Sequence, residues 1–302
     1  MTLPYFIWLF LGTIWGSTWL FIKLGLQNLP PFTFAGFRFV IAVIPLYILL
    51  FVRKPELPKN RDDWYLIFFT GFLTFTINYG LVFWGEGQIS SGLTAILYTT
   101  LPLFGLILAH FLFPVEGLSV VKLVGILIGI AGVTIIFSNQ LNRNNDHALW
   151  GALAILAASF VTAYAGILIK KHGNHIDPLV MTTGQMSFGL VPLLLTGLLL
   201  EGNPLSYHWT GQAWLALFYL ALVGSSLTFV LLYWLMQNME VTKTQLMIFY
   251  STLIAVILGK LIFSEELNWR IIVGGAGILS GLLITNYGYV RQSNQRYKEN
   301  ID

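Results

Sequence analysis

Residues 118–138 read LSVVKLVGILIGIAGVTIIFS, an apolar run that contains one charged residue, Lys122. A transmembrane helix needs about 20 such residues to cross about 30 Å of hydrocarbon. The run lacks the strict alternation of apolar and polar residues that is typical of a strand in a membrane barrel. It therefore predicts a membrane-spanning α-helix, and the chain on either side shows the same pattern.

The composition of the whole chain also indicates a membrane protein. Apolar residues make up 56% of the 302 residues, charged residues make up 10%, and the mean hydropathy is +0.76. A soluble domain has about 25% charged residues, so this chain could not cover a water-facing surface, and its natural solvent is lipid. The net charge of +3 gives no argument for a nucleic acid partner. The absence of cysteine excludes disulfides and thiolate chemistry.

Ten apolar segments of this length are separated by short stretches rich in Pro, Gly, Asn and charge. Only helices suit runs this long, so we expect an all-α polytopic membrane protein with ten transmembrane helices. No basic stretch or cleavage site precedes the first segment, which predicts a retained helix rather than a signal peptide. The predicted spans are residues 4–22, 31–52, 64–84, 89–113, 118–138, 147–169, 178–200, 211–236, 242–263 and 269–290.

The lysines and arginines predict the orientation. With a cytoplasmic N-terminus, eleven of them fall on the cytoplasmic side, whereas only Lys23, Arg143 and Arg270 fall on the other. Because cytoplasmic loops carry an excess of Lys and Arg, both termini are expected in the cytoplasm, with a short C-terminal tail. An even number of spans agrees with this expectation.

The chain also contains an internal repeat, which predicts two five-helix units, residues 1–139 and 140–302. Five is an odd number, so the second unit must enter the membrane from the opposite side. Inverted repeats are a recurrent plan of secondary transporters, which hold their substrate near the midplane between the halves. A shift of 147 residues aligns Lys23 with Lys170, Pro31 with Pro178, Arg38 with Gln185 and Pro45 with Pro192, and a shift of 149 aligns Glu116 with Glu265, Gly125 with Gly274 and Gly132 with Gly281.

Several motifs resemble those of a known family. They are the stretch from Trp15 to Lys23, reading WGSTWLFIK, the segment NYGLVFWGE from Asn78 to Glu86, and the proline segment around Pro102. Together they resemble EamA-type proteins of the drug/metabolite transporter superfamily, over nearly the whole chain. The resemblance implies a ten-helix carrier in the inner (plasma) membrane that moves metabolites, amino acids or xenobiotics, often as an exporter, and is not an enzyme.

Two charged residues within the spans are the strongest candidates for a substrate site. Arg38 lies about 10 Å deep at 1.5 Å per residue, where a charge is costly and usually faces the bundle interior or water. It could contact a carboxylate of the substrate or protein, or extend to the outer headgroups. Glu86 ends the third span. It could be a proton site, a cation contact or the ion-pair partner of Arg38, or it could stand in water at the helix end.

Polar and aromatic residues inside the spans form a second group of candidates. Buried amides and hydroxyls need partners, which a water-filled pathway would supply. Trp and Tyr in spans also serve as interface anchors or in packing, so only part of the group is expected to contact substrate. The candidates are Trp15, Trp19, Asn78, Tyr79, Tyr98, Tyr164, Gln185, Gln245 and Tyr250.

The remaining features favour structural roles. Glu116 and Glu265 begin the fifth and tenth spans, where the helix macrodipole favours a carboxylate. GxxxG spacings in the same spans permit close helix contact, within the protein or across a possible homodimer. The pair His172 and His175 lacks the helical face and further ligands of a metal site. No glycine-rich phosphate loop is present, so neither a metal nor a cofactor is expected.

The sequence therefore predicts a secondary-active transporter of small metabolites, amino acid-like or amphipathic and aromatic, that works by alternating access and exports its substrate. Its expected partners are the small-molecule substrate and the lipid bilayer. An uncoupled facilitative carrier and a membrane-embedded lipid-modifying enzyme remain as alternatives.

Overall fold

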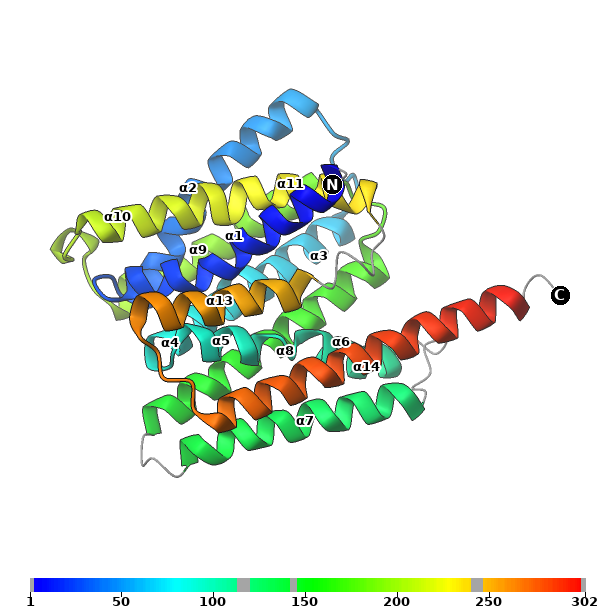
Figure 1. Cartoon of the computed structure of the whole chain (residues 1–302). Coiled ribbons are helices and arrows are strands. Elements are labelled where there is room, and N and C mark those ends of the chain that lie inside the picture. The colour runs from blue at the N-terminus through cyan, green and yellow to red at the C-terminus, as the bar shows by residue number, and fades with distance from the viewer. Residues whose placement is uncertain (1–2, 113–119, 142–145, 240–246, 300–302) are drawn as a thin grey trace.

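The computed structural model describes residues 3–112, 120–141, 146–239 and 247–299, and within these ranges every regular element is a helix (Figure 1). Glu116 and Gln245, which the sequence singled out, lie outside the described residues. Two long apolar helices from distant parts of the chain, α7 and α14, lie side by side along one edge of the molecule.

The helices follow the predicted spans closely, and several spans consist of more than one element. The first part of the chain forms α1 (Leu3–Leu26), α2 (Pro31–Arg53), α3 (Arg61–Gly71), the π-helix η1 (Phe72–Asn78), α4 (Tyr79–Gln88), α5 (Ser91–Tyr98), α6 (Leu101–Leu112) and α7 (Val120–Leu141). The second part forms α8 (Asp146–His172), α9 (Pro178–Leu200), the short 3₁₀-helix η2 (Pro204–Ser206), α10 (Gly211–Phe218), the π-helix η3 (Tyr219–Leu227), α11 (Thr228–Asn238), α13 (Met247–Phe263) and α14 (Trp269–Glu299).

Seven helical segments are long and apolar enough to cross a bilayer, judged by length and composition. They are Leu3–Leu26, Pro31–Arg53, Arg61–Gln88, Ser91–Leu112, His147–His172, Pro178–Leu200 and Gly211–Leu232. Three further apolar helices are shorter over the residues searched, Val120–Ile136, Tyr250–Phe263 and Trp269–Thr285. The protein is thus a multi-pass, all-helical membrane protein.

Three predicted spans are not the regular helices that their patterns suggested. The fourth span is interrupted between α5 and α6, where Thr99 and Thr100 form a turn. Pro102 follows directly and has no N–H to continue the helical ladder. The third and eighth spans each contain a π-helix, η1 and η3, in which the backbone takes up extra residues per turn.

Helices α7 and α14 pack backbone to backbone. Gly125 lies against the carbonyl oxygen of Gly281, and Gly132 lies against that of Gly274, so that a Cβ at either position would clash. As residue numbers rise along α7 they fall along α14, so the two helices run in opposite directions. The predicted glycine spacings are therefore used for close packing within one chain.

Helices α2 and α9 form a second antiparallel pair. Gly197 near the end of α9 lies against Thr33 at the start of α2, and Gly36 lies against Leu194. Pro30 at the N-cap of α2 offers no side-chain hydrogen bond. The carboxylate of Glu201 accepts from the backbone N–H groups of residues 32 and 33 instead, at 2.8 and 2.7 Å. An anion at this position also complements the helix macrodipole.

Glu265 binds the start of a helix, but not the start of its own helix α14. One carboxylate oxygen accepts from the backbone N–H and the hydroxyl of Ser91 at 2.7 and 2.8 Å, and the other accepts from the N–H of Gly92 at 3.0 Å. It therefore supports α5, in the other half of the chain. The prediction that Glu265 complements a helix N-terminus was correct in its chemistry and wrong in its helix.

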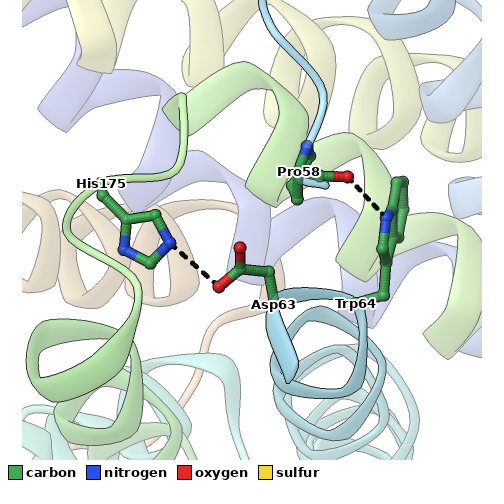
Figure 2. A network of polar contacts seen from close by, with 4 residues as sticks. All are labelled: Pro58, Asp63, Trp64 and His175. Atoms are coloured by element: carbon green, nitrogen blue, oxygen red, sulfur yellow. Dashed lines mark hydrogen bonds and ion pairs between the residues drawn. The ribbon is translucent and has the colours of Figure 1, made fainter. Parts of the chain in front are cut away.

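The end of the molecule that the Lys and Arg count places in the cytoplasm has its own contact between the halves. Figure 2 shows His175, from the loop before α9, with its Nε2 2.9 Å from the carboxylate of Asp63 in the first turn of α3. The indole N–H of Trp64 donates to the carbonyl of Pro58 at 3.0 Å and holds the loop before α3. These contacts tie the α2–α3 loop to the loop before α9.

Candidate functional site

Arg38 of α2 is 3% exposed, so it does not extend to the headgroups as the alternative expectation had it. Its Nε donates to the hydroxyl of Ser225 at 3.1 Å, and its Nη2 donates to the carbonyl of Gly224 at 3.4 Å. Both partners belong to η3, in the second half of the chain. Its third nitrogen, Nη1, is buried without a hydrogen-bond partner. An intramembrane guanidinium with one unused nitrogen is available for an anionic group.

Aromatic rings surround the same guanidinium. Its carbon lies 5.1 Å from the ring centroid of Tyr79, 5.2 Å from that of Phe39 and 5.9 Å from that of Phe83. Such cation–π contacts stabilise a cation that has left water, by about 2 kcal/mol or more in favourable cases. They also leave the region around Nη1 bounded by flat apolar faces, which suit an aromatic or amphipathic ligand.

Glu86 is fully buried at the end of α4, and neither carboxyl oxygen has a hydrogen-bond partner. It therefore forms no hydrogen-bonded ion pair with Arg38, and it is not the water-exposed helix end that was the other expectation. Glu86 follows Phe83 by three residues and shares its helix face. Lys23 lies close by, but its ammonium donates to the backbone carbonyls of Glu86 and Ile89 at 2.9 and 2.7 Å. A buried carboxyl group without a hydrogen bond is costly.

A chain of polar and aromatic contacts runs from η1 to α1 and α8. The hydroxyl of Tyr98 donates to the side-chain oxygen of Asn78 at 3.0 Å and lies 3.2 Å from the hydroxyl of Thr162. The Tyr98 ring packs against Trp19 with centroids 5.4 Å apart. Three of the predicted residues, Trp19, Asn78 and Tyr98, are thus in contact with one another.

A second polar contact joins α1 to η3. The hydroxyls of Ser17 and Tyr219 are 2.6 Å apart, and the Tyr219 ring stacks on Phe21 with centroids 3.9 Å apart. Helix α1 therefore contacts η3 with one turn and Tyr98 of α5 with the next. These contacts and those of Arg38 connect residues from both halves of the chain.

The other predicted residues lie apart from Arg38. Tyr250 of α13 contacts Thr13 through their hydroxyls at 3.0 Å and packs on Trp8. Gln185 of α9 is buried and donates to the hydroxyl of Thr70 at 2.7 Å. Trp15 and Tyr164 are half-buried on α1 and α8. No hydrogen bond or ring contact described for this part of the chain joins these four residues to Arg38.

Four residues of this arrangement were not among the predicted candidates, namely Ser17, Thr162, Tyr219 and Ser225. Hydroxyl residues satisfy themselves within a helix so readily that sequence alone gives them little weight. One signal was available, since Ser225 and Ser226 are consecutive hydroxyls near the middle of an apolar span.

The EamA-like transporter family matches the sequence twice, over residues 3–138 and 149–287. The chain belongs to this family. The two matched segments correspond to the two halves of the internal repeat, so the EamA domain occurs twice in the chain. The resemblance seen in the motifs is confirmed, and the membership identifies a transporter-type protein.

Individual relatives give the same picture. The chain is 28% identical to the uncharacterized transporter YoaV of Bacillus subtilis over 279 residues, covering 92% of this chain and 95% of YoaV. It is 32% identical to the uncharacterized inner membrane transporter YedA of Escherichia coli K12, covering 88% and 85% of the two chains. It is 27% identical to a probable amino-acid metabolite efflux pump of the same strain, covering 91% and 92%.

A solved crystal structure has the same fold. It superposes with a TM-score of 0.64 at 16% sequence identity, covering 96% of this chain and 98% of the other. The EamA fold of the chain therefore agrees with an experimental structure along almost its whole length.

Proposed function

We propose that this EamA protein is a secondary carrier that exports small carboxylate-bearing metabolites, amino acid-like or aromatic, by alternating access. In this proposal ten helices cross the inner membrane in two inverted five-helix repeats, residues 1–139 and 140–302, with both termini in the cytoplasm. The substrate binds between the halves at Arg38 and is exposed to one side of the membrane at a time.

The observation that carries the proposal is the position of Arg38. Its guanidinium is buried, comes from the first half, is held by Gly224 and Ser225 of the second half, and retains a free Nη1. A substrate carboxylate would supply the missing acceptor, and Phe39, Tyr79 and Phe83 would pack on its apolar part. Glu86, one helical turn beyond Phe83, would accept a donor group of the substrate. Trp19, Asn78 and Tyr98 extend the same region.

The helix pairing supports the inverted repeat. Gly125 and Gly132 of α7 correspond, by the shift of 149 residues, to Gly274 and Gly281 of α14. The observed contacts join Gly125 to Gly281 and Gly132 to Gly274. A two-fold axis between equivalent helices produces this exchange of partners, and an axis in the membrane plane makes the two helices antiparallel.

The direction and the substrate class rest on relatives. One similar protein carries the name of a probable amino-acid metabolite efflux pump, and an amino acid has the carboxylate and the ammonium that Arg38 and Glu86 would accept. Export of such metabolites is therefore the form of transport that we propose here.

Transport by purified protein in liposomes tests this function. Vesicles loaded with mixtures of labelled amino acids and aromatic carboxylates should lose unmodified substrate only when the protein is present. Arg38→Lys keeps the charge but loses the planar fork, so transport should fall about 10- to 100-fold, since charge-assisted hydrogen bonds contribute about 1.5–3 kcal/mol. Arg53→Lys, a change of the same type at the exposed end of α2, should transport normally.

Three outcomes would contradict the proposal. If Arg38→Lys transports as well as the unmodified chain, the guanidinium does not bind substrate. If labelled compounds are recovered in altered form, the protein is a membrane enzyme. If no carboxylate moves but other solutes do, the substrate class is wrong.

A further inference from the structure

The two π-helices occupy equivalent positions in the repeat. η1 begins at Phe72 and η3 begins at Tyr219, which is the same shift of 147 residues that relates Pro45 to Pro192. A π-helix is rare, and it costs part of the regular hydrogen-bond ladder. Two of them at one position of a duplicated fold therefore indicate a feature that both halves use.

Each π-helix reaches the proline turn of a helix in the other half. The hydroxyl of Thr76 in η1 donates to the carbonyl of Gly189 in α9 at 2.6 Å, three residues before Pro192. The hydroxyl of Ser226 in η3 donates to the carbonyl of Ala42 in α2 at 2.8 Å, three residues before Pro45. Ala42 and Gly189 are themselves related by 147 residues. The same contact is thus made twice, with the halves exchanged.

The chemistry of proline explains why these carbonyls need a partner. Pro192 has no N–H, so the carbonyl four residues earlier loses its donor and the helix bends at that turn. Neighbouring Ser and Thr side chains can satisfy backbone groups at such a bend in lipid. Thr76 serves the next carbonyl along, and the close approach of Gly189 to Gly71 and Phe75 brings the two helices within reach.

The hydroxyl of Ser226 has a second acceptor. It has one proton and lies 2.8 Å from the carbonyl of Ala42 and 3.1 Å from that of Ala221 in its own π-helix. When the contact with α2 breaks, the proton can therefore turn to Ala221, and no buried donor is left unsatisfied. A bond that opens without an orphaned group is one that can open repeatedly.

We infer that Thr76 and Ser226 are a pair of equivalent positioning residues that control the conformational exchange of the carrier, because each holds a proline turn of the opposite half through one breakable hydrogen bond. The two residues do not contact substrate. They set how readily α9 and α2 flex at Pro192 and Pro45 while the halves move. This inference rests on the proposed transport function, and it extends that function to residues outside the substrate site.

Hydrogen–deuterium exchange of the purified protein, without any substrate, tests the inference directly. Thr76→Val removes the hydroxyl at nearly constant shape and should raise exchange at least threefold in residues 184–196 of α9. Ser226→Ala should do the same in residues 37–49 of α2. Each change should leave the other proline turn as it was. Thr134→Val is the matched control, since Thr134 is exposed and its hydroxyl donates only to Ile130 of its own helix.

The conservative variants Thr76→Ser and Ser226→Thr keep the hydroxyl and should restore the original exchange pattern. In liposomes, Thr76→Val and Ser226→Ala should change the maximal transport rate at least threefold and leave the half-saturation concentration within twofold, whereas a substrate residue changes the latter. Unchanged exchange at both proline turns would overturn the inference, whether or not transport is observed. Altered exchange with no transport of any substrate would contradict the proposed function and leave the two contacts standing.

Discussion

The Nε of Arg38 donates to the hydroxyl of Ser225 across 187 residues of sequence and between the two halves of the repeat, at 3.1 Å. The same hydroxyl donates in turn to the carbonyl of Leu220 at 3.0 Å, within η3. The only charged side chain of α2 that lies buried in its span is thus held by the irregular part of another helix. Any movement of η3 relative to α2 changes where the guanidinium points.

Replacing Ser225 by alanine should weaken substrate binding more than it weakens the fold. The change leaves the Nε of Arg38 without its acceptor, at a cost of about 1–3 kcal/mol for a buried polar group. We expect the half-saturation concentration in the liposome assay to rise about tenfold. Ser206→Ala, which removes an exposed hydroxyl from the loop after α9, serves as the control. An unchanged half-saturation concentration in Ser225→Ala would show that Ser225 does not position Arg38.

Replacing Glu265 by glutamine should lower thermal stability. The carboxylate accepts three hydrogen bonds at the start of α5, and the amide offers one oxygen and no charge to the same groups. Loss of a helix cap costs about 1 kcal/mol, so the melting temperature of the detergent-solubilised protein should drop by a few degrees. Glu266→Gln, at the exposed neighbouring position, should melt like the unmodified chain. Equal melting of both variants would remove the role assigned to Glu265.

Labelling from the two sides of the membrane should reveal the inversion. The chain has no cysteine, so Asn60→Cys and Leu205→Cys each introduce a single thiol, in the α2–α3 loop and in the equivalent loop after α9. Both positions are exposed. A membrane-impermeant maleimide added to whole cells should label Leu205→Cys, and Asn60→Cys should react only after the cells are opened. Labelling of both from the same side would contradict the inverted repeat.

Sequence patterns located the helices well where local signals coincide with the fold. Helix α9 was expected over 178–200 and forms over those residues, because Pro178 suits its first turn and Asp177 caps it with bonds to residues 179 and 180. Hydropathy could not locate η1, η3 or the break before Pro102, since a π-helix and an α-helix bury the same apolar residues. These irregularities depend on partners in other helices.

The candidate site was predictable in its charged members and not in their partners. Arg38 and Glu86 stood out because a charge in an apolar span needs an explanation. Their burial came from the fold, as did the choice of Ser225 over Glu86 as the partner of Arg38. Tyr250, Gln185 and Tyr164 carry the same chemical signal as Tyr98, and only the arrangement of the helices separates them. Hydroxyls such as Thr76 carry almost no signal, because most of them bond within their own helix.

The attachment of Glu265 to Ser91 has a consequence for how the protein is made. A ribosome adds roughly 5–20 residues per second, so the 174 residues between these partners take roughly 10–35 s to appear. During that interval α5 has been inserted, and its first N–H groups have not yet met their carboxylate. The nascent amino-terminal half therefore waits in the bilayer unfinished, and it is completed by a loop that leaves the ribosome among the last parts of the chain.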